Sequence, residues 1–309
     1  MSNVIAIAGG FGFLGANITK LLKAQGFDAI PFSRRSGVDI RDWGKISSYT
    51  KKMKPDIVVN CAADVGGIAY NSVNPVGVYE NNLLIGFNLL KASFDAGVKK
   101  FVNIIPNCTY PGVAEIYTEK GWWDGPMHDT VVTYGMPRKT LWVHAWALKM
   151  KYGFKSIHLV LPNLYGPDDH FDPIRSHALG AIIKKVVDAK TNKIPTVQIW
   201  GTGNPIREWL YVEDAAEGII RAIDRYDDIE IMNIGAGVGY SIREIADMVK
   251  VAADWDGEFT FDKSRPDGAP KKILDISKMR DVLKWMPKTD IKEGIKKTVY
   301  WYLENRTEL

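Results

Sequence analysis

Short apolar runs alternate with segments of helical periodicity from the N-terminus to about residue 162. Strands that are buried on both faces carry continuous apolar runs, whereas helices repeat their apolar positions every three or four residues. This alternation predicts an α/β fold, a doubly wound parallel sheet that binds its ligand at the carboxyl ends of the strands. The expected strands are residues 4–8, 28–32, 56–62 and 101–105, and the expected helices are residues 17–23, 76–96 and 134–152.

The second half of the chain also alternates, and a polar residue stands at the start of two of its helices. Ser241 is expected to cap one helix, and Asp214 is expected either to cap another or to contact a ligand. The expected strands are residues 196–200, 229–234 and 259–262, and the expected helices are residues 178–189, 214–223, 241–253, 277–285 and 291–305.

Composition narrows the class of protein. The 309 residues are 46% hydrophobic and 25% charged, which is typical of a folded enzyme. The net charge of +4 has no long single-sign run, so neither a nucleic-acid nor a membrane surface is indicated. No apolar run approaches the roughly 18 residues of a membrane helix. With only Cys61 and Cys108 and no signal-like N-terminus, a reducing, cytoplasmic setting is expected.

The glycines at positions 9, 12 and 15 lie between the first expected strand and the first expected helix. Residues without a Cβ allow a tight turn and a close approach of backbone to a pyrophosphate, and a helix N-terminus attracts anions. Gly9, Gly12 and Gly15 are therefore interpreted as a dinucleotide cradle, although glycines also serve purely structural turns.

Two arginines follow the second expected strand. An acidic residue at this strand end suits the ribose hydroxyl of NAD, whereas arginine accommodates the 2′-phosphate of NADP. Arg34 and Arg35 therefore favour NADP, with NAD as the alternative cofactor and a solvated basic loop as the alternative reading.

An acidic cluster with one histidine lies later in the chain, at Asp168, Asp169, His170 and Asp172. Its spacing matches no metal motif, so we expect a solvated, turn-forming loop and no metal.

Three motifs stand in a recognisable order: the glycine run at 9–15, a tyrosine that opens a helix, Tyr134, and the segment 161–167. On these motifs the chain resembles the extended short-chain dehydrogenase/reductases, the NAD-dependent epimerase/dehydratase family, and within it the GDP-L-fucose synthases. The resemblance covers nearly the whole chain. Further matching blocks are residues 65–68, 163–167, 176–177, 200–203, 207–208, 214 and 266–268.

The resemblance implies a Rossmann-type sheet with a smaller, interleaved substrate lobe. Residues 1–162 and 205–235 would form the dinucleotide-binding domain, and residues 163–204 and 236–309 the nucleotide-sugar-binding lobe. It also implies a homodimer through the helical faces of residues 76–96 and 140–152. Trp142 and Trp146 suit that interface or the intramolecular core.

By resemblance, Tyr134 is the general acid or base, and Cys108 and His177 are the pair that moves α-protons during epimerisation. The family's serine or threonine and its lysine are replaced by Pro106 and Arg138. Arg138 keeps the positive charge, but exchange of lysine for arginine is not conservative.

Neighbours of the two replaced positions are candidate substitutes. Asn107 or Thr109 would replace the missing hydroxyl only with a shift of backbone, and whether Lys139 replaces the missing lysine is left open.

By resemblance, residues from 163 onward face the nucleotide sugar. Arg207 and Lys184 suit a pyrophosphate, and Trp200 suits a base or the protein core equally. The expected catalytic residues are Tyr134, Cys108, His177, Arg138 and Asn107; the cofactor-binding residues are Gly9, Gly12, Phe13, Leu14, Gly15, Arg34, Arg35, Asp39, Ala62, Tyr134, Arg138, Pro162, Asn163 and Leu164; and the substrate-binding residues are Val65, Gly66, Asn163, Lys184, Trp200, Arg207 and Arg265.

These features predict an NADP-dependent reductase of a GDP-linked 4-keto sugar, with or without C3/C5 epimerisation. One alternative is a nucleotide-sugar epimerase or 4-dehydrogenase that holds NAD(P) tightly and has altered catalytic residues. A second alternative is a non-catalytic nucleotide-sugar-binding protein, which has no need to keep Tyr134, Cys108 and His177 together.

Overall fold

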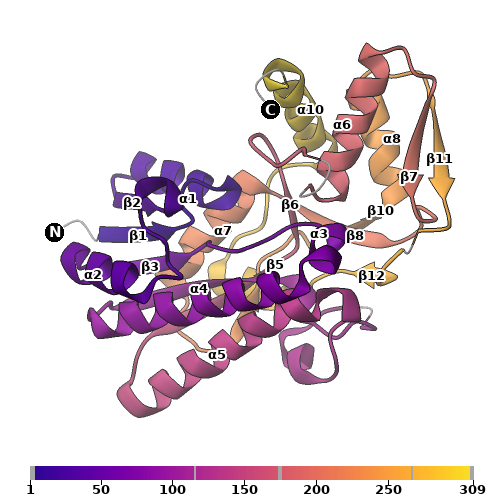
Figure 1. The fold of residues 1–309 in the computed structure, drawn as a ribbon. Helices are drawn as coiled ribbons and strands as arrows, with labels where there is room; N and C mark the ends of the chain where they lie inside the picture. Colours follow the sequence, from indigo (N-terminus) through magenta and orange to yellow (C-terminus); the bar gives the residue numbers. More distant parts are fainter. Residues whose placement is uncertain (1–3, 115, 173–175, 266, 307–309) are drawn as a thin grey trace.

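A six-stranded, fully parallel sheet forms the centre of the molecule (Figure 1). The computed structural model describes residues 4–114, 116–172, 176–265 and 267–306. The chain winds outward in both directions from β1, which places a crevice at the carboxyl ends of β1 and β3. In sheet order the strands are β2 (Asp28–Phe32), β1 (Val4–Ala8), β3 (Ile57–Asn60), β4 (Lys100–Pro106), β5 (Ser156–Leu161) and β9 (Ile231–Asn233).

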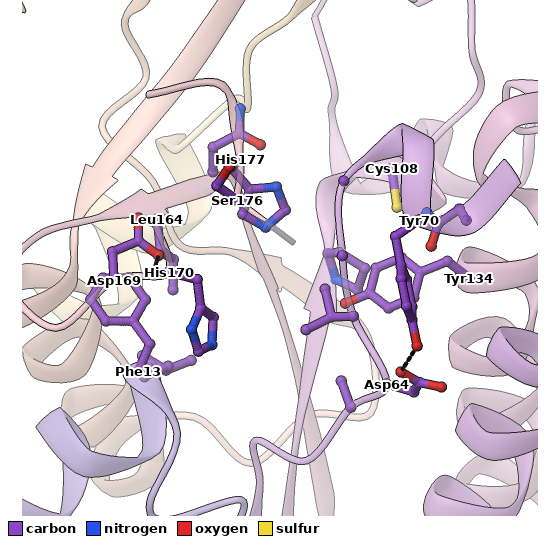
Figure 2. Close-up of a pocket in the computed structure, with 18 of the residues that line it drawn as sticks. Phe13, Asp64, Tyr70, Cys108, Tyr134, Leu164, Asp169, His170, Ser176 and His177 are labelled. Carbon is purple, nitrogen blue, oxygen red and sulfur yellow. Dashed lines mark hydrogen bonds between the residues drawn. The ribbon is translucent and has the colours of Figure 1, made fainter. Parts of the chain in front are cut away.

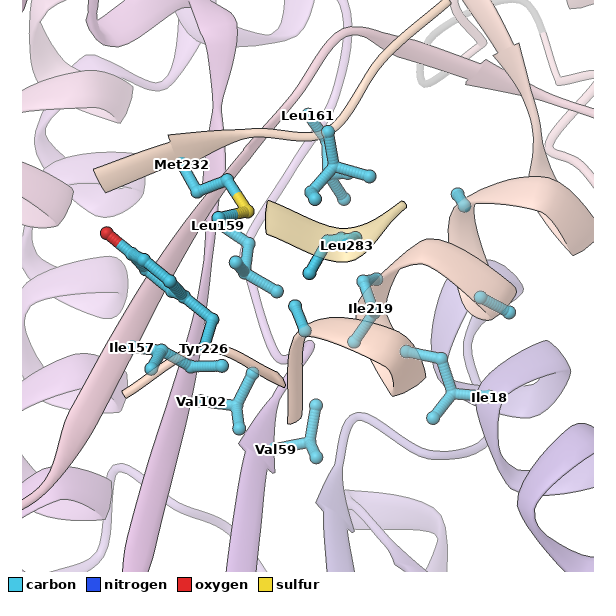
Figure 3. Packing of buried hydrophobic residues seen from close by; sticks show 14 of the residues in the cluster. Ile18, Val59, Val102, Ile157, Leu159, Leu161, Ile219, Tyr226, Met232 and Leu283 are labelled. Carbon is cyan, nitrogen blue, oxygen red and sulfur yellow. The ribbon is translucent and has the colours of Figure 1, made fainter. Parts of the chain in front are cut away.

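Helices cover both faces of this sheet, because alternate side chains along β1 are apolar on each face. Ile5 and Ile7 pack into the cluster formed with α1 (Phe13–Ala24), α7 (Val212–Arg225) and α9 (Ser277–Leu283), part of which Figure 3 shows. Ala6 and Ala8 pack on the opposite face, against α2 (Trp43–Met53), α4 (Pro75–Asp95) and α5 (Val132–Tyr152). The predicted doubly wound α/β fold is therefore confirmed.

A smaller lobe, built from short strands and three helices, stands over the carboxyl edge of the sheet (Figure 1). Its helices share one apolar cluster that is separate from the clusters of the large sheet. Its strands are β6 (Asn163–Tyr165), β7 (Thr196–Trp200), β8 (Ile206–Tyr211), β10 (Gly239–Ser241), β11 (Glu258–Asp262) and β12 (Lys271–Lys272), and its helices are α6 (Ala178–Thr191), α8 (Ile242–Ala252) and α10 (Ile291–Asn305).

Strand β8 joins the two parts. It pairs with β6, β10 and β12 of the lobe, and its side chains alternate between two cores. Leu210 packs into the cluster under the large sheet, whereas Trp209 and Tyr211 pack into the cluster of the lobe. Because β8 pairs with strands of the lobe, we propose to assign it to the lobe. Because α9 packs against the large sheet, we propose to assign it to the dinucleotide-binding part.

Several local expectations are confirmed and others are corrected. The side chain of Ser241 caps α8 in a reciprocal capping box with Glu244. Asp214 lies inside α7 and is not its cap; its carboxylate accepts backbone hydrogen bonds from Lys288 (3.3 Å) and Thr289 (3.0 Å). Among the described residues no helix is long and apolar enough to cross a membrane.

Short helical turns form much of the irregular chain. One of them begins directly after Gly67, which is its N-cap. These elements are α3 (Ile68–Val73) and the 3₁₀ turns η1 (Arg34–Ser36), η2 (Asn107–Thr109), η3 (Glu119–Trp123) and η4 (Asp129–Val131).

Candidate active site

A cavity of about 1110 Å³ lies between the carboxyl ends of the sheet and the lobe. Its wall includes every residue expected in the site except Arg265. In Figure 2, Cys108 and Tyr134 come from one wall, and Ser176 and His177 come from the other. The fold thus gathers residues from Gly9 to Lys272 of the chain around one space.

The glycine turn after β1 has the geometry of a phosphate cradle. Gly9 has a φ of +71°, and a Cβ there would lie 2.9 Å from the backbone of Ala62. A Cβ on Gly15 would lie 2.3 Å from the carbonyl oxygen of Gly9, so only glycine lets the helix approach the turn this closely. Gly12 is the N-cap of α1, whose first turn faces the cavity with its backbone N–H groups.

Three arginines line the far end of the cavity beyond the cradle. Arg34 and Arg35 stand on η1, which Ser33 caps. Arg41, which was not expected, forms an ion pair of 2.7 Å with Asp39. This hydrogen-bonded guanidinium lowers the pKa of Asp39 to about 2. The carboxylate is therefore ionised and neutralised by Arg41, which leaves Arg34 and Arg35 available to an anion.

Arg34→Ala is expected to weaken NADPH binding about tenfold, because a charge-assisted hydrogen bond to phosphate contributes about 1.5–3 kcal/mol and Arg35 retains part of the charge. NADH has no 2′-phosphate, so its affinity should stay the same. Fluorescence titration of both nucleotides measures the two dissociation constants. Equal weakening of NADPH and NADH would contradict the assignment of Arg34 to the 2′-phosphate.

Tyr134 and Arg138 stand one turn apart at the start of α5. The Arg138 guanidinium lies 4.7 Å from the centre of the Tyr134 ring, and both side chains line the cavity. Burial raises the pKa of the Tyr134 phenol, and the charge of Arg138 counteracts part of that rise. The phenol is therefore protonated at neutral pH and suited to donate a proton.

Lys139 does not replace the missing lysine. It is 4% exposed and does not line the cavity; its Nζ donates a hydrogen bond to the carbonyl oxygen of Trp122. The same ammonium lies 5.0 Å from the Trp122 ring and 4.5 Å from the Trp123 ring. Helix α5 is continuous through Pro137, so only Arg138 brings a cation to Tyr134 from this helix.

The segment after β4 offers a candidate donor next to Pro106, the position where the family has its hydroxyl. Thr109 is engaged away from the cavity: its Oγ1 donates to the carbonyl oxygen of Pro106 (2.9 Å) and accepts from the indole of Trp122 (2.8 Å). Asn107 is 5% exposed and lines the cavity, and its Nδ2 has no hydrogen-bond partner among the residues that the structure describes. Buried amides are nearly always paired, so this unpaired donor indicates a ligand acceptor.

Cys108 and His177 are both uncharged groups in this environment. Burial raises the pKa of the Cys108 thiol, although Lys272 and Arg138 counteract it. Burial lowers the pKa of His177, and the nearby His170 adds a smaller contribution in the same direction. A neutral thiol and a neutral imidazole on opposite walls can serve as acid and base across a bound molecule (Figure 2).

The lobe contributes two neighbouring cations. Arg207 and Lys272 are paired in register across β8 and β12, and both line the cavity. Burial lowers the pKa of each side chain, so an anion between them would be favourable. Lys184 lines the cavity too, but it is already paired with Asp188 at 2.8 Å.

Trp200 is not a core residue. It is 56% exposed at the rim of the cavity, and the Arg265 guanidinium lies 5.0 Å from its ring. Arg265 therefore contacts a cavity residue, Trp200, although it does not itself line the cavity. The expected turn that follows includes Pro266, which lies outside the described residues.

Asp169 corrects the expectation of a solvated acidic loop. It is 6% exposed, lines the cavity and accepts a 2.7 Å hydrogen bond from the backbone N–H of His170. Burial raises its pKa to about 7. In the part of the chain that the structure describes, no three His, Cys, Asp or Glu side chains are grouped to hold a metal ion.

Replacing Asp169 with asparagine should change how stability depends on pH. The folded-state pKa of about 7 exceeds the ordinary 3.8, so this group's contribution is complete below pH 3.8 and is lost as pH rises toward 7. The free energy of unfolding of Asp169→Asn relative to wild type should therefore increase between pH 5 and 7, by up to about 1.4 kcal/mol per pH unit. Urea titrations at pH 5, 6, 7 and 8 measure it, and a constant difference would contradict it.

Other cavity residues were not anticipated from the sequence: Arg41, Asp64 and Tyr70. The sequence did contain one indication of the surroundings of Asp64. Asn81 and Asn82 are poor helix formers, which indicates that they bond to a neighbouring loop, and both bond to Asp64.

Comparison with known proteins places the chain among enzymes of nucleotide-sugar metabolism. The model of the "NAD dependent epimerase/dehydratase family" matches residues 5–235. GDP-L-fucose synthase 1 of Arabidopsis thaliana is 34% identical over 97% of this chain and 93% of its own length.

Two solved structures share the fold over nearly their full length. A GDP-6-OMe-4-keto-L-xylo-heptose reductase from C. jejuni has a TM-score of 0.92 and 27% identity, covering 98% of both chains. A GDP-L-fucose synthetase from Naegleria fowleri bound to NADP has a TM-score of 0.88 and 28% identity, covering 99% of this chain and 94% of the other.

Proposed function

The chain belongs to the NAD dependent epimerase/dehydratase family, and from this premise we propose that it is an NADP-dependent reductase of a GDP-linked 4-keto sugar. The observation that carries the proposal is the single cavity that holds the glycine cradle, Tyr134 with Arg138, and the cation pair of the lobe. Relatives that act on GDP-sugars, by their names, align with almost the whole chain.

The cradle and the arginines fit NADP. Gly9, Gly12 and Gly15 would admit the pyrophosphate against the N-terminus of α1, and Arg34 and Arg35 would bind the 2′-phosphate. The remaining contacts would come from Phe13, Leu14, Ala62, Pro162, Asn163 and Leu164. When bound, the nicotinamide supplies the hydride.

The substrate carbonyl would lie between Asn107 and Tyr134. The unpaired Nδ2 of Asn107 would donate to the carbonyl oxygen, and the Tyr134 phenol would give that oxygen its proton as the ketone becomes an alcohol. Arg138 would stabilise the resulting tyrosinate, which water reprotonates.

Epimerisation would use Cys108 and His177. One group would remove the α-proton next to the carbonyl, and the other would return a proton from the opposite face (Figure 2). The nucleotide would lie toward the lobe, with its diphosphate at Arg207 and Lys272 and its base against Trp200. Val65 and Gly66 would contact the sugar.

The test is incubation with GDP-4-keto-6-deoxy-mannose and NADPH, followed by loss of absorbance of the reduced nicotinamide. Turnover supports the reductase. In D₂O, deuterium at C3 or C5 of the product shows epimerisation, and its absence shows simple reduction. Binding without turnover would favour the binding-protein alternative, and redox-neutral conversion of a GDP-sugar would favour an epimerase.

We further propose a homodimer through α4 and α5. Trp142 is intramolecular, since its indole donates to the carbonyl oxygen of Ile229 (2.9 Å), but neighbouring apolar side chains are exposed. Trp146 is 44% exposed and Phe87 49% exposed on these packed helices. Trp146→Glu is expected to halve the mass measured by sedimentation equilibrium, whereas an unchanged mass would contradict this interface.

The reducing cytoplasm is the proposed setting, because Cys61 and Cys108 are both free and the role of Cys108 requires a thiol.

A further inference from the structure

A carboxylate and a phenol beside Tyr134 have no role in the chemistry above. Asp64 lies in the loop after β3, and Tyr70 lies on α3. The Tyr70 hydroxyl donates to Oδ1 of Asp64 at 2.8 Å, and both side chains line the cavity (Figure 2). A phenol that donates its proton to a carboxylate presents an electron-rich oxygen as an acceptor.

Helix α4 holds Asp64 in place. Asn81 donates its Nδ2 to Oδ2 of Asp64 at 2.8 Å. Asn82 bonds to both the backbone N–H and the carbonyl oxygen of Asp64, each at 2.9 Å. The Oδ1 of Asn81 accepts from Arg41 at 2.9 Å. The carboxylate that orients Tyr70 is therefore fixed on both of its oxygens.

Close packing places Tyr70 where the two parts of the molecule meet. A Cβ on Gly66 would lie 2.6 Å from that of Tyr70, so the missing side chain lets the ring fold back over the loop. A Cβ on Gly67 would lie 3.2 Å from the carbonyl oxygen of Ser176, next to His177. Helix α3 also packs against η4, which leads directly into the helix of Tyr134.

We propose that Tyr70 binds the sugar ring of the nucleotide sugar, with its phenol oxygen accepting a hydrogen bond from a ring hydroxyl, and that Asp64 is its positioning residue. This inference rests on the proposed function, because it requires a GDP-linked sugar in the cavity. In the proposed pose the base and the diphosphate would lie toward the lobe cations Arg207 and Lys272, so that only the sugar would contact Tyr70.

Calorimetric titration with GDP-mannose and with GDP separates the sugar from the nucleotide. Tyr70→Phe is expected to weaken GDP-mannose binding about 3- to 10-fold and to leave GDP binding unchanged, because only the sugar loses a hydrogen bond. Tyr79→Phe is the matched control, since Tyr79 is 38% exposed on α4 and lies outside the cavity. Thermal melting of each variant confirms that it is folded.

Asp64→Asn provides the second measurement. It should weaken GDP-mannose binding without affecting GDP, and the double variant should be no weaker than Tyr70→Phe, since the two residues act as a unit. Additive losses would overturn the positioning role of Asp64. If wild type binds both ligands and Tyr70→Phe weakens neither or both equally, the Tyr70 proposal is wrong while the proposed function stands. If wild type binds neither, both fail.

Discussion

Replacing Tyr134 with phenylalanine is expected to lower kcat for NADPH-dependent reduction by about 10²- to 10⁴-fold, the usual contribution of a positioned proton donor. NADPH and GDP affinities should remain close to wild type, because the ring itself is kept and still stacks on Arg138. Steady-state kinetics and nucleotide titration measure the two effects separately. Tyr152→Phe, at the exposed end of the same helix, is the control.

The pH profile gives an independent check on Tyr134. Burial raises the pKa of its phenol above the ordinary value of 10, so the donor form persists through neutral pH. The contribution of this group to kcat should stay constant from pH 6 to 9 and decline only above pH 10. A decline through pH 7 that disappears in Tyr134→Phe would show a depressed pKa and contradict this assignment.

Replacing Asn107 with alanine is expected to have the second large effect on kcat. Loss of one preorganised donor to a carbonyl oxygen costs about 10²- to 10³-fold in kcat. The melting temperature should hardly change, because Nδ2 of Asn107 bonds to no other group in the described part of the chain. Kinetics and thermal melting of the same preparation distinguish catalysis from folding.

Thr109→Val is the matched control for Asn107→Ala. It should lower the melting temperature, since Trp122 loses its acceptor, while changing kcat much less. Pro106→Ser in the Asn107→Ala background places a hydroxyl where the family has one and should restore part of the rate. A full loss of kcat in Thr109→Val with little change in Asn107→Ala would transfer the role to Thr109.

Most strands of the large sheet were predictable because they carry continuous apolar runs, although no bounds were predicted for β5. The apolar runs at β1 and β3 can be recognised from the sequence without knowing which strands pair with them, since nearly every residue in them is buried. Strand β8 was missed because its sequence, IREWLY, mixes charged and apolar residues that face different surroundings. Strands β6, β10 and β12 have only two or three residues, too few for a periodic signal.

Local parts of the site were predictable and long-range parts were not. The glycine cradle depends on residues within one turn, so its spacing alone indicates it. Whether Arg138 or Lys139 brings its cation to Tyr134 depends on the rotation of α5. It also depends on Trp122, which binds the Lys139 ammonium and lies 17 residues before it in the chain. The hydrogen bonds that join Asp64 to Asn81 and Asn82 span 17 and 18 residues. No local sequence pattern indicates that Asp64 is the partner of these two asparagines.

The alternation of side chains along β8 has a mechanical consequence. Because Leu210 is anchored in one core and Trp209 and Tyr211 in the other, a swing of the lobe away from the sheet would pull buried side chains out of both. We therefore expect the molecule to resist hinge opening at this strand. The width of the gap between the sheet and the lobe would therefore stay nearly constant through turnover.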